Sequence, residues 1–142
     1  MALESTGRTH WEGDLLSGSG VASLDSGAAD PMEVTWKART EEHGGLTSPE
    51  ELIAAAHSSC FSMAFSSGLA KNDTPPKSLD VTATATFVPG EGITTMKLEV
   101  VGDVEGITEE EFRELAEAAK DGCPVSQALA GNVDISIEAR LA

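Results

Sequence analysis

The sequence predicts an α+β fold, in which strands lie near both ends of the chain and helices pack between them. Three observations indicate this class. Residues 47–69 form the longest apolar run, residues 33–39 and 79–90 alternate between apolar and polar side chains, and residues 108–121 repeat apolar side chains at helical spacing. The length of 142 residues is typical of one domain. We therefore expect a single domain over residues 1–142.

The first part of the chain favours strands. Residues 8–13 and 19–24 are two short strand patterns joined by a turn-rich segment. Residues 33–39 place Val34, Trp36 and Ala38 on one face, which is typical of a half-buried antiparallel strand. We expect Arg39 to end that strand, just before a polar loop.

Residues 47–69 predict a long helix with Cys60 near its middle. Ser48 and Glu51 have the spacing of a capping box, and Pro49 occupies the first helical position. Apolar side chains on several faces indicate a helix buried in a core. The run is long enough to suggest a membrane span, but His57 and five serines interrupt it and no basic residues flank it.

The second part predicts a hairpin, a helix and a closing strand. Residues 79–90 and 92–101 are paired strands joined by a tight turn. Residues 108–121 form an amphipathic helix that begins with a capping box of Thr108 and Glu111. Pro124 marks a further first helical turn, which makes Cys123 its N-cap. Residues 133–141 alternate as a final strand.

The charge balance limits the kinds of partner. The chain has 9 Lys and Arg residues against 24 Asp and Glu residues, a net charge of −15. Such a surface repels phosphate backbones and anionic lipids, so we expect neither a nucleic acid nor a membrane partner. The N-terminal residues lack the apolar segment of a secretory signal, which predicts a cytoplasmic protein. Two cysteines in a reducing compartment are catalytic, metal-binding or inert.

The sharpest hypothesis is a thiol peroxidase without a cofactor. Its nucleophile would be the Cys60 thiolate, which requires a cation or hydrogen-bond donors. Arg39 offers both, and Glu50 would hold the guanidinium through a bidentate pair. Cys123 would condense with the Cys60 sulfenic acid to form a disulfide.

Helix geometry adds a condition to this hypothesis. Glu50 and Cys60 lie ten residues apart, which is about 15 Å along a straight helix. If two copies of the helix pack antiparallel across a twofold axis near Ala55, Glu50 of one chain lies beside Cys60 of the other. A joint role therefore implies a symmetric homodimer with two composite sites.

Simpler interpretations exist for each candidate. A lone cysteine such as Cys60 in an apolar helix is commonly a small core residue. Arg39 at the end of a strand is commonly solvated, and Glu50 at a helix start is explained by the helix dipole. His57, one turn before Cys60, acts on the thiol in one interpretation and is a buried core histidine in the other.

Two further functional classes remain open. A metal or small-ligand module would use His57, Cys60, Cys123 and His43, although zinc sites commonly have closely spaced ligands at both ends. A redox sensor would use the same two thiols without turnover.

Three segments resemble the OsmC/Ohr family of peroxide reductases. The segment SPEELIAAAHSSCFSMAFS resembles the family's active-site helix, CPVSQAL its second-cysteine motif, and EVTWKAR the segment that brings in its arginine. The segments occur in the family's order, so the resemblance covers essentially the whole chain. His57 before the cysteine makes the chain more similar to the OsmC branch, whose members are osmotically induced hydroperoxide reductases.

The resemblance implies an OsmC-like fold, with antiparallel sheets wrapping a long buried central helix in an intertwined homodimer. It places the peroxidatic cysteine on Cys60, the resolving cysteine on Cys123 and the glutamate on Glu50. The arginine falls on Arg39, with Arg8 as the other N-terminal candidate. It also implies a hydroperoxide substrate and a lipoyl-type dithiol reductant.

Overall fold

The structure, a computed structural model, describes residues 1–142 and divides into two compact units. The first unit comprises residues Met1–Pro49 and the second comprises Glu50–Ala142. Mixed α and β elements in this order confirm the predicted α+β class.

The first unit contains a small antiparallel sheet in the order β1-β2-β3. Its strands are β1 (Gly7–Glu12), β2 (Ser19–Leu24) and β3 (Met32–Val34). The two strands predicted at 8–13 and 19–24 are thereby confirmed within one residue at each end. The sheet buries little of its own surface, since every residue of β1 is exposed. Arg8 and Asp25 form an exposed ion pair. Arg8 Nε donates to Asp25 Oδ1 at 2.7 Å, and Nη2 donates to Oδ2 at 2.9 Å.

The prediction of one strand over residues 33–39 is wrong beyond Val34. Residues Trp36–Thr40 form a short helix, α1. The Thr35 side chain caps this helix by accepting a hydrogen bond from the Ala38 N–H at 3.1 Å. The seven alternating residues 33–39 fit a strand. However, Thr35 caps the turn that follows it, and Ala38 is buried in the resulting helix.

The second unit is built on α2 (Pro49–Lys71) and a three-stranded sheet in the order β4-β5-β6. The helix begins at Pro49, as the sequence predicts. Strands β4 (Ser78–Val88) and β5 (Gly92–Asp103) form the predicted antiparallel hairpin. The positive φ angles of Gly90 and Gly92, 86° and 98°, allow its tight turn.

Strand β6 (Asp134–Leu141) pairs with β5 in parallel. The expectation of antiparallel sheets therefore holds for the first unit and for β4–β5, but not for this pair. The reason is the connection, since two helices cross over between β5 and β6. These are α3 (Glu109–Gly122), with the predicted Thr108–Glu111 capping box, and α4 (Pro124–Leu129), with Cys123 as its N-cap.

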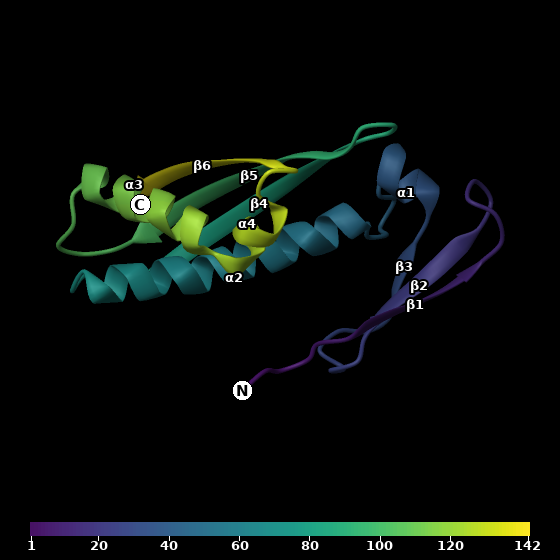
Figure 1. The fold of residues 1–142 in the computed structure, drawn as a ribbon, viewed down its shortest axis with the longest axis horizontal. Helices are drawn as coiled ribbons and strands as arrows, with labels where there is room; N and C mark the ends of the chain where they lie inside the picture. Colours follow the sequence, from purple (N-terminus) through teal and green to yellow (C-terminus); the bar gives the residue numbers. More distant parts are fainter. The chain divides into compact units, whose positions relative to one another are not determined.

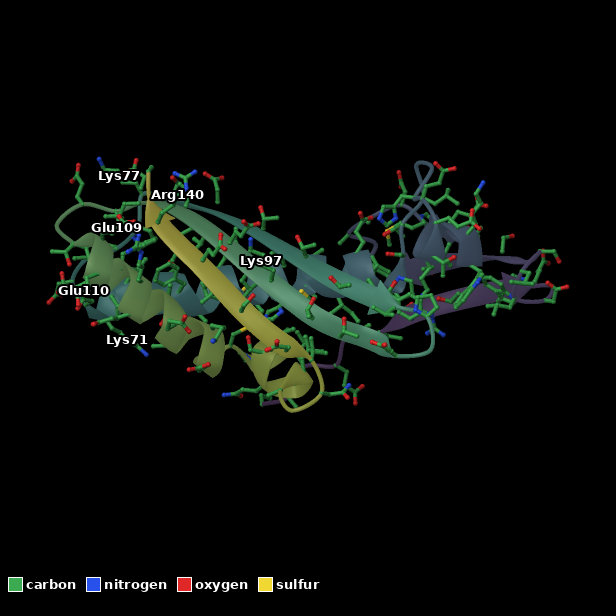
Figure 2. All side chains as sticks on the ribbon, turned by 90° about the horizontal axis from the view of Figure 1, so that it is seen from above. Lys71, Lys77, Lys97, Glu109, Glu110 and Arg140 are labelled. Carbon is green, nitrogen blue, oxygen red and sulfur yellow. The ribbon has the colours of Figure 1, made fainter.

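Helices α2 and α3 cover one face of this sheet (Figure 1). The main core lies between these helices and the sheet, and it contains three fully buried aromatic rings. The Phe65 ring lies 5.4 Å from Phe61 and 5.0 Å from Phe112, between ring centroids. On the opposite face of the sheet most side chains are polar. Figure 2 shows Lys97 there, where it forms ion pairs with Glu99 and Glu138 at 3.2 and 3.3 Å.

Helix α2 enters the core through a single stripe of side chains rather than on all faces. The buried residues are Glu50, Ala54, His57, Phe61, Phe65 and Leu69. The opposite stripe is exposed in the single chain and contains Ala55, Ala56, Ser59 and Met63. Length and composition alone would let α2 cross a membrane. The buried aromatic stripe instead assigns it to the core of the second unit.

Candidate functional site

Cys60 lies near the middle of α2, at the border of the core. The next residue, Phe61, is fully buried, and Cys60 itself is half-buried and packs against the core cluster. Nearly continuous α2 hydrogen bonding fixes the position of this residue, because α2 is a regular helix of 23 residues. The thiol is thus set on a rigid element, partly open to solvent.

Cys123 lies at the junction of α3 and α4 and is fully buried. Its N–H donates to the Ala119 carbonyl at 2.9 Å and closes α3. Its carbonyl accepts from the Gln127 N–H at 3.0 Å and opens α4. Two helix ends therefore fix one backbone position, which is the N-cap that Pro124 predicts.

The two thiols are free and lie within interaction distance of each other. The Val125 backbone N–H, at the start of α4, donates to the Cys60 sulfur. The structure therefore brings together the two cysteines that lie 63 positions apart (123 minus 60) in the sequence. Their proximity is the feature that a disulfide-forming pair requires.

The immediate surroundings of Cys60 favour the thiol over the thiolate. Burial is the main cause that raises its pKa, and the neighbouring Cys123 raises it further, while the Val125 N–H lowers it. A thiolate nucleophile at this position therefore needs an additional positive charge.

Arg39 lies on α1, in the first unit, with its guanidinium 5.9 Å from the centre of the Trp36 ring. This stacking is a cation–π contact, which orients the planar guanidinium. Arg8, the other candidate, lies on the exposed β1 and pairs with Asp25, which follows β2. The action of Arg39 on the thiol stays a prediction.

Glu50 is buried in the first turn of α2, with 6% of its surface exposed. It shares the continuous helix with Cys60, so the separation of about 15 Å expected from ten residues of helical rise applies here. A single copy of α2 therefore keeps these two residues apart. The role of Glu50 stays a prediction.

His57 is fully buried, and burial lowers its pKa. Its Nε2 lies 2.7 Å from Ser126 Oγ, and its Nδ1 has no hydrogen-bond partner. Neither ring nitrogen forms a hydrogen bond with the Cys60 thiol. No contact in the structure therefore supports His57 as a base that activates this thiol. His43 is exposed in a loop. No group of three or more His, Cys, Asp and Glu side chains has a metal-binding arrangement.

Sequence reasoning missed two members of this site, the Val125 N–H and Ser126. Ser126 had an available signal, since it follows Cys123 by three residues just as His57 precedes Cys60 by three. Residues three apart share a helix face. The Val125 contact is a backbone contact, which side-chain patterns do not indicate.

Comparisons with known proteins give a consistent result. Residues 42–138 match the family described as OsmC-like protein. The peroxiredoxin OsmC of Escherichia coli is 38% identical over 141 residues, covering 97% of this chain and 98% of the relative. The organic hydroperoxide resistance protein OhrA of Bacillus subtilis is 32% identical over 129 residues, covering 89% and 86%.

Solved structures have the same fold. An organic hydroperoxide resistance protein OsmC from Legionella pneumophila superposes with a TM-score of 0.76 at 22% identity, covering 99% of this chain and 98% of the other. An organic hydroperoxide resistance protein from Elizabethkingia anophelis gives a TM-score of 0.71 at 24% identity and covers 100% of both chains.

Proposed function

This chain belongs to the OsmC-like family, and from that premise we propose that it is a thiol-dependent hydroperoxide reductase. Its substrates are organic hydroperoxides, with hydrogen peroxide as a smaller alternative. Two relatives are named peroxiredoxin and organic hydroperoxide resistance protein, and the second matches 89% of this chain. The single observation that supports the assignment most is the adjacency of the free Cys60 and Cys123 thiols.

In the proposed cycle, Cys60 is the peroxidatic residue. Its thiolate attacks the distal peroxide oxygen, the O–O bond breaks, and the alkoxide takes a proton and leaves as an alcohol. Cys60 is oxidised to a sulfenic acid. The Cys123 sulfur then attacks the Cys60 sulfur, and the sulfenic oxygen leaves as water. An external dithiol, of the lipoyl type, reduces the disulfide by thiol–disulfide exchange.

Arg39 is the group that we assign to thiolate formation. Burial and Cys123 raise the pKa of Cys60, so a guanidinium is needed to stabilise the negative charge. The same fork of donors can orient the peroxide oxygens. Glu50 would pair with that guanidinium and fix its orientation.

We propose a homodimer with composite sites in the cytoplasm. One chain separates Glu50 from Cys60 by about 15 Å along α2, whereas two antiparallel copies of α2 would bring them together. The exposed stripe of α2 consists of small or flexible side chains, including Ala55, Ala56 and Met63. Such a stripe permits close helix approach. In this arrangement, both compact units belong to one domain that spans residues 1–142.

The test is peroxide oxidation followed by intact mass measurement and thiol counting. One equivalent of an organic hydroperoxide should remove two protons and both free thiols without linking two chains. Cys60→Ser should abolish turnover with a dithiol, while Cys123→Ser should reduce one equivalent and then stall or over-oxidise.

Other outcomes would overturn the proposal. Equal turnover in wild type and Cys60→Ser excludes Cys60 as the nucleophile. Oxidation of Cys60 without multiple turnovers with any dithiol would instead favour a redox sensor. Retention of both thiols after peroxide would exclude a peroxidase.

A further inference from the structure

A buried polar contact joins α2 to α4 and has no part in the peroxidase cycle described above. His57 on α2 is fully buried, and Ser126 on α4 has 4% of its surface exposed. Their side chains meet at 2.7 Å, between Nε2 and Oγ. A hydrogen bond between two buried side chains is costly to leave unmade, because each partner has already lost its contact with water.

The position of this contact relative to the thiols is regular. His57 precedes Cys60 by three residues, and Ser126 follows Cys123 by three residues. Each polar residue therefore lies one turn from a cysteine on about the same helix face. The His57–Ser126 contact and the Cys60–Cys123 contact are successive contacts between the same two segments. Val125, whose N–H donates to Cys60, lies between Cys123 and Ser126 in the sequence.

Helix α4 is held by few side chains: Val125 and Leu129 pack against the two hydrophobic clusters, and Ser126 is buried. It has six residues, which is too short for a stable helix without tertiary contacts. Cys123 provides no side-chain cap. Ser126 is the only fully buried residue of α4, while Pro124, Gln127 and Ala128 are exposed. Ser126 adds a directional contact with α2 to these apolar contacts, through its hydrogen bond with His57.

The imidazole suits this role in its neutral form. Burial lowers the pKa of His57, so the ring is uncharged at neutral pH. Nδ1 has no partner. The tautomer with its proton on Nε2 donates to Ser126 Oγ and leaves only a lone pair unsatisfied at Nδ1, whereas the other tautomer would leave a buried N–H without an acceptor.

We propose that His57 and Ser126 are positioning residues whose hydrogen bond keeps Cys123 within attack distance of oxidised Cys60. The proposal rests on the two-cysteine cycle above. After peroxide has converted Cys60 to a sulfenic acid, two reactions compete for it. Attack by the Cys123 sulfur expels water and forms the disulfide, while a second peroxide molecule oxidises the same sulfur to a sulfinic acid and leaves as an alcohol.

The hydrogen bond acts on this competition through proximity. Disulfide closure is intramolecular, so its rate depends on the effective concentration of Cys123 at Cys60. The reaction with the second peroxide depends on the peroxide concentration instead. Release of α4 therefore slows closure and shifts the products toward sulfinic acid.

The experiment measures both oxidation steps in four variants of the full-length protein. Ser126→Ala removes the hydroxyl, Ser126→Thr retains it, and Gln127→Ala is the matched control on the exposed side of α4. Rapid quenching with a thiol-blocking reagent, followed by intact mass, gives the rate of Cys60 oxidation and the ratio of disulfide to sulfinic acid at rising organic hydroperoxide. His57→Leu removes the other partner and fills its site with an apolar side chain.

We expect Ser126→Ala and His57→Leu to slow disulfide closure about fivefold, the fold-change that loss of one typical hydrogen bond produces. Their sulfinic acid fraction should rise with peroxide, while Ser126→Thr and Gln127→Ala follow the wild type. If Ser126→Ala acted through a general loss of structure, Ser126→Thr would not restore the wild-type rate of closure. Circular dichroism identifies any variant that fails to fold.

The failures are distinguishable. If the wild type is oxidised and closes its disulfide, but Ser126→Ala and His57→Leu close at the wild-type rate, the positioning role is refuted and the peroxidase remains. If peroxide leaves Cys60 unoxidised in the wild type, the proposed function itself fails. If one of the two variants does not fold, the other still decides.

Discussion

Gly102→Ala should destabilise the protein through one specific contact. Gly102 lies on β5 beneath the Phe112 ring of α3. A Cβ at this position would lie 2.6 Å from Phe112 Cζ, 2.7 Å from Cε2 and 3.1 Å from Leu79 Cδ2. Carbon atoms do not approach this closely without strain, so the ring must move. Its freedom is limited, because Phe112 is fully buried and packs 5.0 Å from the Phe65 ring.

The expected loss follows from two opposing terms. Overpacking of a core by a methyl group costs about 1–3 kcal/mol. Replacement of glycine by alanine in a regular element returns about 0.5–1 kcal/mol of conformational entropy. We therefore expect a net loss of about 1–2 kcal/mol. The matched control is Gly122→Ala at the end of α3, where an added Cβ meets nothing within 4 Å. There we expect a small gain in stability.

The assay is urea unfolding followed by circular dichroism, at one protein concentration because oligomerisation shifts apparent stability. The double variant Gly102→Ala/Phe112→Leu tests the cause, since leucine removes the ring atoms that clash. The double variant should lose less stability than the sum of the two single variants, because neighbouring positions couple. Additive losses, or a Gly102→Ala protein as stable as the wild type, would refute the proposed clash.

Three further outcomes follow from particular contacts. Thr108→Ala should lower the free energy of unfolding by about 1 kcal/mol, since the Glu111 N–H donates to Thr108 Oγ1 at 3.1 Å; an unchanged urea midpoint would contradict the cap. Burial lowers the pKa of His57 from 6.5. Neutral His57 therefore stabilises the folded protein above pH 6.5, and this stabilisation is lost as pH falls toward the lower pKa that His57 has in the folded state. The stability difference between wild type and His57→Leu should therefore shrink between about pH 7 and pH 5, and a constant difference in urea midpoints would oppose this. Arg39→Ala should slow Cys60 oxidation about 10- to 100-fold and make its rate rise steeply with pH, because burial raises the pKa of Cys60; Arg8→Ala is the control, and equal effects of the two in stopped-flow oxidation would remove Arg39 from the mechanism.

Local sequence patterns predicted most of the secondary structure. Pro49 and Pro124 mark the first residues of α2 and α4, and the Thr108–Glu111 capping box marks the start of α3. Such signals act between residues close in sequence, so they can be recognised without the fold. The strand prediction was wrong for residues 36–39 because a short alternation does not distinguish a strand from a short helix capped by Thr35.

The sequence did not indicate features that depend on contacts between distant residues. Nothing local in residues 134–141 shows that β6 pairs with β5 in parallel, because strand direction depends on the crossover through α3 and α4. The exposed stripe of α2 was likewise hidden, since its alanines and Met63 are as apolar as the buried stripe. Burial depends on which face the sheet covers, and composition does not report it.

For the candidate site, the sequence by itself determined the chemical groups and their local settings: a thiol in the middle of a long helix and a second thiol at the N-cap of a short one. The tertiary structure alone decided that these thiols meet, that burial raises the pKa of Cys60, and that His57 bonds Ser126 rather than Cys60. The physical reason is that helix starts and turns are encoded by neighbouring residues, whereas a contact between residues 60 and 123 requires the whole second unit to pack α4 against α2.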